Sequence, residues 1–275
     1  MVEDYMWVVD VLFEGEGLLE APRPMPDGSV VFANTTVGGV HRWSPAGVTT
    51  LVARRRGIGG IAAHVDGGLL VGGRDLVHVG VAGLTTVLEV DGATGVNDMT
   101  VTADGSVLVG VLRHRPGAGE TAPPSELLRM TPAGSVRVVV DDLLWPNGIG
   151  ASPDGMTVYV AEFAAARVRV LGPDGGSVFA RAPRGECDGL AVDVEGGVWV
   201  ALGSGGGIAR FTPDGVLDEL IDVSGRFVSS LAFSGRAIYV TTVGALLRLD
   251  VGVEGLAVGE ARIPVARHHV TGHAR

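Results

Sequence analysis

One short turn signal recurs six times along this chain of 275 residues. Each copy is a small or acidic residue followed by glycine, and a short strand of apolar residues follows each glycine. The six glycines are Gly28, Gly67, Gly105, Gly155, Gly196 and Gly235. They lie roughly 40 residues apart, except for a longer step from 105 to 155, and such a period is typical of repeat architectures. Because tight turns between apolar strands form β-hairpins, the pattern predicts a fold built from repeated hairpins.

A second hairpin separates successive copies of this turn. These hairpins fall at residues 40–52, 76–90, 127–140, 168–180 and 208–221, with a less regular one at 246–265. Each repeat therefore holds four strands, which is one blade of a β-propeller. The sequence predicts an all-β fold, a six-bladed β-propeller with four antiparallel strands per blade, as one domain over residues 1–275. Residues 6–13 are expected to close the ring by pairing with residues 263–265, and the tail 267–275 is expected to be frayed.

The composition excludes several classes of function. The net charge is −10 and no lysine occurs, which argues against a nucleic-acid partner and removes Schiff-base chemistry and a Walker-type phosphate loop. No run of 18 or more apolar residues exists and the N-terminus has no basic region, so neither a membrane span nor a signal peptide is expected. A single cysteine, Cys187, rules out an internal disulfide and fits a reducing, cytoplasmic compartment. These features leave a small molecule as the expected partner, with the oligomeric state open.

Side-chain oxygens recur at one position of the repeat, eight residues before each turn glycine. The residues there are Glu20, Gly59, Asn97, Asn147, Asp188 and Phe227. In a propeller these positions converge where the innermost strands enter the central channel. An all-oxygen set of this kind suits Ca²⁺, or Mg²⁺ or Mn²⁺, and lacks the His or Cys that would favour zinc. The alternative is that Asn147-Gly148 and Asp188-Gly189 are ordinary turn formers.

Several motifs combine into a family resemblance. They are Glu20-Ala21-Pro22-Arg23, Asn97-Asp98, Pro146-Asn147-Gly148 and Cys187-Asp188-Gly189-Leu190-Ala191-Val192-Asp193. With these motifs the chain resembles the family of senescence marker protein 30, gluconolactonase and luciferin-regenerating enzyme. The resemblance implies a six-bladed propeller with one divalent cation in the channel and, in many members, lactone hydrolysis. It implies Glu20, Asn147 and Asp188 as metal ligands and Asp188 also as general base. Asn97 would be a further ligand or would bind substrate and a metal-bound water.

The chain also departs from this family's pattern. Sugar-lactone members typically carry an arginine two positions before the Asn-Asp pair, where this chain has Gly95. Asn34 replaces an acid that usually follows the first blade's second strand, and Glu162 stands where a shorter Asp is common. Asn34 and Glu162 are therefore candidate substrate-binding residues. The missing arginine favours a less polar ester or lactone over a polyhydroxylated one.

The extra length between residues 105 and 155 predicts a long loop at residues 113–126. The segment is dense in Gly and Pro and has no periodicity, so we expect it to lack regular structure. It joins the second and third strands of its blade, which places it on the face of the expected cation. Long loops of this kind are often lids or binding loops, so Arg113 and His114 are candidates for contact with the substrate.

These features predict a metal-dependent hydrolase of a lactone or related cyclic ester. The cation would polarise the carbonyl, and Asp188 would act as general base with Asn97 as the second catalytic residue. Whether Asp188 or a metal-bound water is the effective base is open at this point. Two alternatives also remain: a metal-assisted isomerase or cyclase on the same scaffold, and a non-catalytic calcium-binding propeller that presents a face to a partner.

Overall fold

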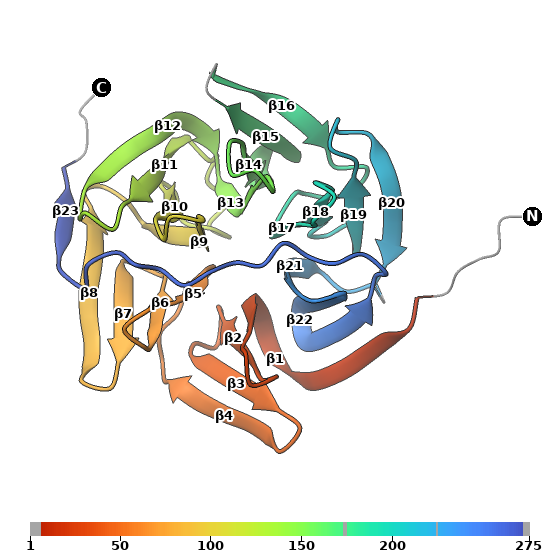
Figure 1. Ribbon diagram of the computed structural model, residues 1–275, viewed down its shortest axis with the longest axis horizontal. Coiled ribbons are helices and arrows are strands. Elements are labelled where there is room, and N and C mark those ends of the chain that lie inside the picture. Colours follow the sequence, from red (N-terminus) through yellow and green to blue (C-terminus); the bar gives the residue numbers. More distant parts are fainter. Residues whose placement is uncertain (1–6, 173–174, 224, 272–275) are drawn as a thin grey trace, which may run out of the picture.

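The computed structural model describes residues 7–172, 175–223 and 225–271. In these ranges the chain forms five hydrogen-bonded sheets arranged around a central axis, so the predicted all-β propeller is confirmed (Figure 1). No helix in the same ranges has the length and apolar character needed to cross a membrane.

In the described ranges, three of the sheets have four strands, one has five and one has six. The four-stranded sheets are β9 (Gly95–Val101), β10 (Val107–Leu112), β11 (Pro124–Met130) and β12 (Val136–Leu144); β13 (Pro146–Ala151), β14 (Val158–Glu162), β15 (Arg167–Gly172) and β16 (Gly175–Arg181); and β17 (Leu190–Val192), β18 (Val198–Ala201), β19 (Gly207–Phe211) and β20 (Leu217–Asp222). The five-stranded sheet is β5 (Ile61–Ala63), β6 (Leu69–Val71), β7 (Leu76–Gly80), β8 (Gly83–Val90) and β23 (His268–Val270). The six-stranded sheet has the order β21 (Val228–Ser234), β22 (Ala237–Asp250), β1 (Val9–Pro24), β2 (Val30–Asn34), β3 (Val40–Ser44) and β4 (Gly47–Val52).

The prediction of six four-stranded blades is wrong, because two long strands join the first and last repeats into one sheet. The first part of β1 pairs with β22, and the second part pairs with β2. Similarly, β22 pairs with β21 through its first half and with β1 through its second half. The strands continue through Gly17 and Gly244, which take left-handed φ values of 83° and 77°. Glycine permits this conformation without steric cost, so the chain bends there without ending the strand.

The termini also differ from the prediction. The N-terminal strand pairs with residues 243–249 of β22 and not with residues 263–265, and Met6 lies outside the described residues. Residues 268–270 are not frayed, because they form β23, which pairs in parallel with Leu88–Val90 of β8. The tail thereby adds a fifth strand to the sheet of β5 to β8. This strand pairs in parallel, whereas the sequence predicted antiparallel strands.

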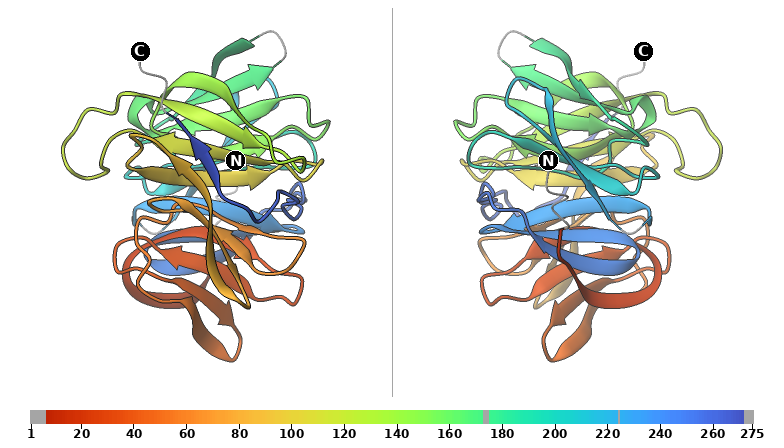
Figure 2. Two further views of the ribbon diagram at one scale, coloured as in Figure 1. Left: turned by 90° about the vertical axis from the view of Figure 1, so that its left-hand side faces the viewer. Right: turned by 90° about the vertical axis from the view of Figure 1, so that its right-hand side faces the viewer.

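Before reaching β23, residues 251–267 cross the face that carries the turn glycines (Figure 1). Main-chain hydrogen bonds tie this segment to several sheets, from Leu256 N to Val192 O at 2.8 Å and from Arg262 N to Gly105 O at 2.9 Å. Beneath it, residues of the innermost strands line a cavity of about 470 Å³ together with residues 256–259. The loop after β10 projects from the opposite face (Figure 2). Residues 251–267 and the loop after β10 therefore lie on opposite faces of the ring.

Apolar side chains fill the spaces between neighbouring sheets. One cluster includes Leu70 and Leu88 from the five-stranded sheet and Met99, Val109 and Leu128 from the next sheet. Burial of such side chains stabilises each by about 1.5–3 kcal/mol, so the contacts between sheets hold the ring together.

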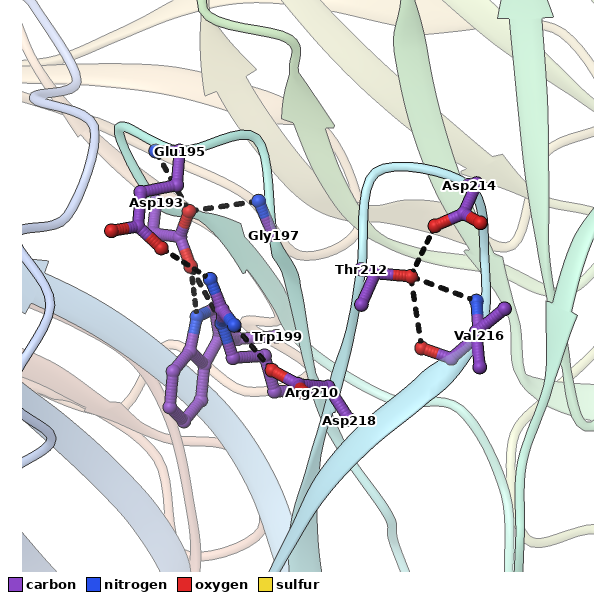
Figure 3. A network of polar contacts seen from close by, with 9 residues as sticks. All are labelled: Asp193, Glu195, Gly197, Trp199, Arg210, Thr212, Asp214, Val216 and Asp218. Carbon is purple, nitrogen blue, oxygen red and sulfur yellow. Dashed lines mark hydrogen bonds and ion pairs between the residues drawn. The ribbon is translucent and has the colours of Figure 1, made fainter.

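A buried carboxylate fixes the inner turn of the β17–β20 sheet (Figure 3). Asp193 is fully buried and accepts hydrogen bonds from Gly197 N at 2.8 Å, Trp199 Nε1 at 2.8 Å and Arg210 Nε at 2.9 Å. The Glu195 N–H donates a fourth bond at 3.0 Å. These donors satisfy the carboxylate without water.

We predict that Asp193→Asn lowers the free energy of unfolding by about 3–5 kcal/mol, the usual cost of breaking a buried ion pair. The amide removes the charge opposite Arg210 and turns one NH₂ toward N–H donors. Asp214, in the exposed turn of the same sheet, is the matched control, and Asp214→Asn should have a much smaller effect. Urea unfolding of both variants is the measurement, and equal losses would contradict this role of Asp193.

Candidate metal centre

β-Bulges place two of the four candidate ligands, Asn97 and Asn147, near the start of their innermost strands. On β9, Asn97 and Asp98 lie between two paired positions and face the single residue Gly110 of β10. On β13, Asn147 and Gly148 interrupt the pairing with β14 in the same way. A bulge bends the strand and redirects its side chains, and bulges are frequent next to active sites. Asn97 and Asn147 thus lie at irregularities of the strands, whereas Glu20 pairs with Ala33 and Asp188 precedes β17.

The four candidate ligands are largely removed from solvent. Glu20 is 7% exposed, Asn147 6% and Asp188 2%, while Asn97 is half-buried. Asn97 Nδ2 donates to Pro146 O at 3.0 Å, which leaves its Oδ1 as the atom able to meet a ligand. Asp188 Oδ1 is buried and has no hydrogen-bond partner within the described ranges. Such an atom is costly unless something else satisfies it.

Two glycines allow neighbouring strands to approach the axis closely. A Cβ at Gly59 would lie 2.1 Å from Asn97 Oδ1, so a side chain there would displace the amide. A Cβ at Gly148 would lie 2.2 Å from Leu190 N, on the next inner strand. Gly148 N also donates to Asp188 O at 3.0 Å, which fixes Asn147 and Asp188 beside each other.

The electrostatics of the site come from carboxyl groups buried near one another. Burial, followed by repulsion from Asp188 and Asp98, raises the pKa of Glu20 well above its ordinary value. Burial, followed by repulsion from Asp98 and Glu186, raises the pKa of Asp188 in the same way, while a hydrogen bond from Asn147 lowers it. A cation placed among these groups would relieve their repulsion and favour their charged forms.

Asp98 is a member of the site that the sequence reasoning missed. Burial raises the pKa of Asp98 to about 6, opposed by the Met99 N–H and by Arg23. The pair Asn97-Asp98 was visible as a motif, but successive strand residues normally point to opposite faces. The bulge in β9 could not be read from the sequence, so the contribution of Asp98 to the field on Glu20 and Asp188 could not be either.

The donor set fits a hard divalent cation. Within the described ranges, no three His, Cys, Asp or Glu side chains are grouped so that they could hold a metal ion. A site built on Glu20 and Asp188 therefore needs the amide oxygens of Asn147 and Asn97 as well. Carboxylate and amide oxygens are ligands of Ca²⁺, and the unpartnered Asp188 Oδ1 gives this set an unused donor.

Two of the predicted substrate-binding residues form ion pairs within the protein. Arg113 makes a two-point ion pair with Glu126, with nitrogen-to-oxygen distances of 3.0 and 2.8 Å. Glu162 is fully buried, pairs with Arg167 and accepts a hydrogen bond from Leu144 N at 2.8 Å. Both side chains therefore hold neighbouring strands and loops together.

The other two predicted substrate-binding residues, Asn34 and His114, differ in their hydrogen bonding. Asn34 Nδ2 donates to Glu16 O at 2.7 Å and its Oδ1 accepts from Val37 N at 3.0 Å, so its amide orders the adjacent loops. His114 is 3% exposed, and its ring centroid lies 4.5 Å from that of Trp145. Among the residues that the structure describes, neither ring nitrogen of His114 has a hydrogen-bond partner. Burial lowers the pKa of His114, which favours the neutral imidazole.

The loop that begins at Arg113 is shorter than predicted. Residues 113–123 form no helix or strand, as expected, but β11 already begins at Pro124. The loop projects from the face opposite residues 251–267, which is the face where the innermost strands begin (Figure 2).

The position of the absent arginine is closed. A Cβ at Gly95 would lie 2.8 Å from Gly73 O, a main-chain atom of the neighbouring sheet. Val96 N donates to the same oxygen at 2.7 Å, which holds the two segments together. An arginine at Gly95 would therefore require the backbone to move.

Comparison with known proteins confirms the resemblance drawn from the motifs. The family described as the SMP-30/Gluconolactonase/LRE-like region matches residues 15–244. The L-arabinolactonase of Azospirillum brasilense is 33% identical over 131 residues, which are 44% of this chain and 44% of that protein. The 6-deoxy-6-sulfogluconolactonase of Pseudomonas putida is 33% identical over 130 residues, which are 42% of this chain and 44% of that protein.

The fold is also found in solved structures. Regucalcin from Agrobacterium tumefaciens, described as a calcium-binding protein, matches with a TM-score of 0.83 and 22% identity, over 94% of this chain and 99% of that chain. At this identity the likeness establishes the fold alone. The matched segments span less than half the length of either lactonase.

We predict that Ca²⁺ raises the melting temperature of the parent protein and that Asp188→Asn abolishes this response. At a hundredfold excess over its dissociation constant, the ion should stabilise the folded state by about 2.7 kcal/mol. Without divalent ions, Asp188→Asn should melt higher than the parent, because it removes one of the mutually repelling buried carboxyls.

Asp104→Asn, on the face of the turn glycines, is the control and should respond to Ca²⁺ like the parent. Calorimetry with and without Ca²⁺, Mg²⁺ and Mn²⁺ is the measurement. A parent protein indifferent to all three ions would contradict the site, as would an Asp188→Asn variant with the parent's response.

Proposed function

The chain belongs to the SMP-30/gluconolactonase/LRE-like family, and we propose that it hydrolyses a lactone or related cyclic ester with the help of one divalent cation, Ca²⁺ being the expected ion. The observation that carries this proposal is the buried, unpartnered Asp188 Oδ1 beside the Asn147 amide and near Glu20. The likeness to two lactonases over part of the chain supports the choice of substrate class.

Glu20, Asn147 and Asp188 would hold the cation, and Asn97 would complete or adjoin the set. When bound, a divalent cation acts as a Lewis acid on the carbonyl oxygen of the lactone and stabilises the developing negative charge. Asn97 is oriented for its part by the hydrogen bond from Nδ2 to Pro146 O. This bond occupies Nδ2, so the amide oxygen is the atom left for a ligand.

Asp188 would act first as general base and then as general acid. Its carboxylate takes a proton from the water that attacks the carbonyl carbon, and the carbon–oxygen bond of the ring then breaks. The released ring oxygen receives the proton from Asp188, so lactone and water yield one hydroxy acid. Asp188 is held for this by its main chain, since its N–H donates to Ala201 O at 2.9 Å and its carbonyl accepts from Gly148 N.

A thiol nucleophile does not fit the same position. Cys187 is buried, and burial raises the pKa of its thiol to about 12. The neutral thiol is a poor nucleophile, because the thiolate is the reactive form. Cys187 therefore contributes packing beside Asp188.

We predict that the protein opens lactone rings with release of acid, that EDTA abolishes this activity and that Ca²⁺ restores it. Asp188→Asn should lower kcat by more than the roughly 10²–10⁴-fold that a positioned general base contributes, because it also removes a ligand of the cation, whereas Cys187→Ala should retain activity. A pH-stat assay over a panel of lactones and aryl esters is the measurement.

The other outcomes separate the alternatives. Hydrolysis that survives EDTA would overturn the role of the cation. Conversion of substrate without acid release, followed by NMR, would indicate an isomerase or cyclase. Binding of Ca²⁺ with no turnover of any substrate would indicate a non-catalytic calcium-binding propeller.

A further inference from the structure

Four aromatic rings form a continuous chain of contacts around part of the channel entrance. The centroid distances are 4.5 Å from His114 to Trp145, 4.4 Å from Trp145 to Phe163 and 6.4 Å from Phe163 to Phe227. The rings come from three sheets and from positions up to 113 residues apart. We call the three outer rings, Trp145, Phe163 and Phe227, the aromatic arc.

The aromatic arc lies beside the candidate ligands. Trp145 directly precedes Pro146-Asn147, and Phe163 N donates to Trp145 O at 3.1 Å. Phe227 occupies in its repeat the position that Asp188 occupies in the preceding one. Around the axis β17 stands between β14 and β21 (Figure 1). Phe163 follows β14, Asp188 precedes β17 and Phe227 precedes β21, so the contacting rings belong to the connections on either side of the one that carries Asp188.

The surface of the arc is available to a ligand. Trp145, Phe163 and Phe227 are each half-buried, whereas His114 is buried against the edge of Trp145. Trp145 also has a left-handed φ of 60°, which is rare for a bulky residue and costs of order 1–3 kcal/mol. Strain of this size is typical of functional sites, because elsewhere selection would remove it.

The polar side chains that the sequence suggested for substrate binding at this face mostly make contacts within the protein. Arg113 is paired with Glu126, Glu162 with Arg167, and both ends of the Asn34 amide bind the main chain. A side chain at Gly95 is excluded by the main chain of Gly73. What these residues leave for contact beside the candidate cation is the aromatic arc.

We infer that the aromatic arc binds a planar or apolar substituent carried by the lactone ring, with His114 as a positioning residue that supports Trp145. This inference rests on the proposed lactone hydrolysis and specifies its substrate class. Aromatic side chains offer flat apolar area that stacks on planar groups, and ligand sites combine such area with a few oriented polar groups. Here Asn97 and Asp188 orient the reacting ester, and the arc selects what is attached to it.

The test compares γ-phenyl-γ-butyrolactone with γ-butyrolactone, which differ only in the planar substituent. The parent should prefer the phenyl compound in kcat/KM. Phe163→Ala and Phe227→Ala should each reduce this preference about tenfold, in the range expected for lost apolar contacts in a pocket. A change in this ratio cannot come from general loss of fold, which would lower both rates together.

Phe179→Ala is the matched control, because Phe179 packs on Tyr159 and Phe211 in the outer part of its sheet. It should leave the ratio unchanged. Melting temperatures with and without Ca²⁺ show that each variant is folded. If the parent has no preference, or if the arc variants keep it, the inference is wrong even though the hydrolysis stands.

Binding of the matched lactams, which resist hydrolysis, separates this inference from the proposed function. Saturation-transfer NMR should show that 5-phenyl-2-pyrrolidinone binds more tightly than 2-pyrrolidinone and loses about tenfold in affinity with Phe163→Ala. If this holds while no lactone is hydrolysed, the arc is a binding surface and the hydrolase proposal fails. Equal binding of the two lactams would overturn the arc.

Discussion

Burial of like charges on the channel axis is the constraint on which the rest of this structure depends. Glu20, Asp98 and Asp188 are each less than a tenth exposed, and burial raises the pKa of all three carboxyls. Repulsion from Asp188 and Asp98 raises the pKa of Glu20 further, and repulsion from Asp98 raises that of Asp188. Arg23 opposes the charge of Asp98, but its guanidinium also donates twice to Ile61 O, at 2.9 and 2.6 Å. Such an arrangement is unfavourable by itself and becomes favourable once a cation enters it. The bulges and the close approach of strands at Gly59 and Gly148 serve to build it.

The two faces of the ring have different roles. On one face the turn glycines are crossed by residues 251–267, which tie several sheets together and end in β23. On the other, the innermost strands begin, the loop after β10 projects and the aromatic arc surrounds part of the entrance. The main-chain ties between sheets and the buried Asp193 therefore lie on the first face, and the proposed chemistry lies on the second. This separation lets loops at the entrance change substrate preference without weakening the ring.

The repeat of turn glycines was enough to predict an all-β propeller and to bring Glu20, Asn97, Asn147 and Asp188 into one register. The number of blades could not be predicted, because β1 and β22 continue through Gly17 and Gly244 and no residue type there indicates that a strand runs on from one repeat into the next. The bulge in β9 at Asn97 and Asp98 cannot be recognised from the types of its residues. Contacts such as Phe163 with Phe227 depend on the curvature of the whole ring. Arg113, Glu162 and Asn34 were chosen by their chemistry, but their partners lie elsewhere in the chain and were invisible from it.

The central claim is that the oxygens gathered at the start of the innermost strands hold one divalent cation. A crystal structure of the protein grown with calcium, with anomalous data collected at long wavelength, tests it most directly. We predict one anomalous peak on the axis, with oxygens of Glu20, Asn147 and Asp188 at about 2.3–2.6 Å and Asn97 in or next to the shell. An axis without a peak in protein saturated with calcium, or a peak held by other residues, would contradict the account.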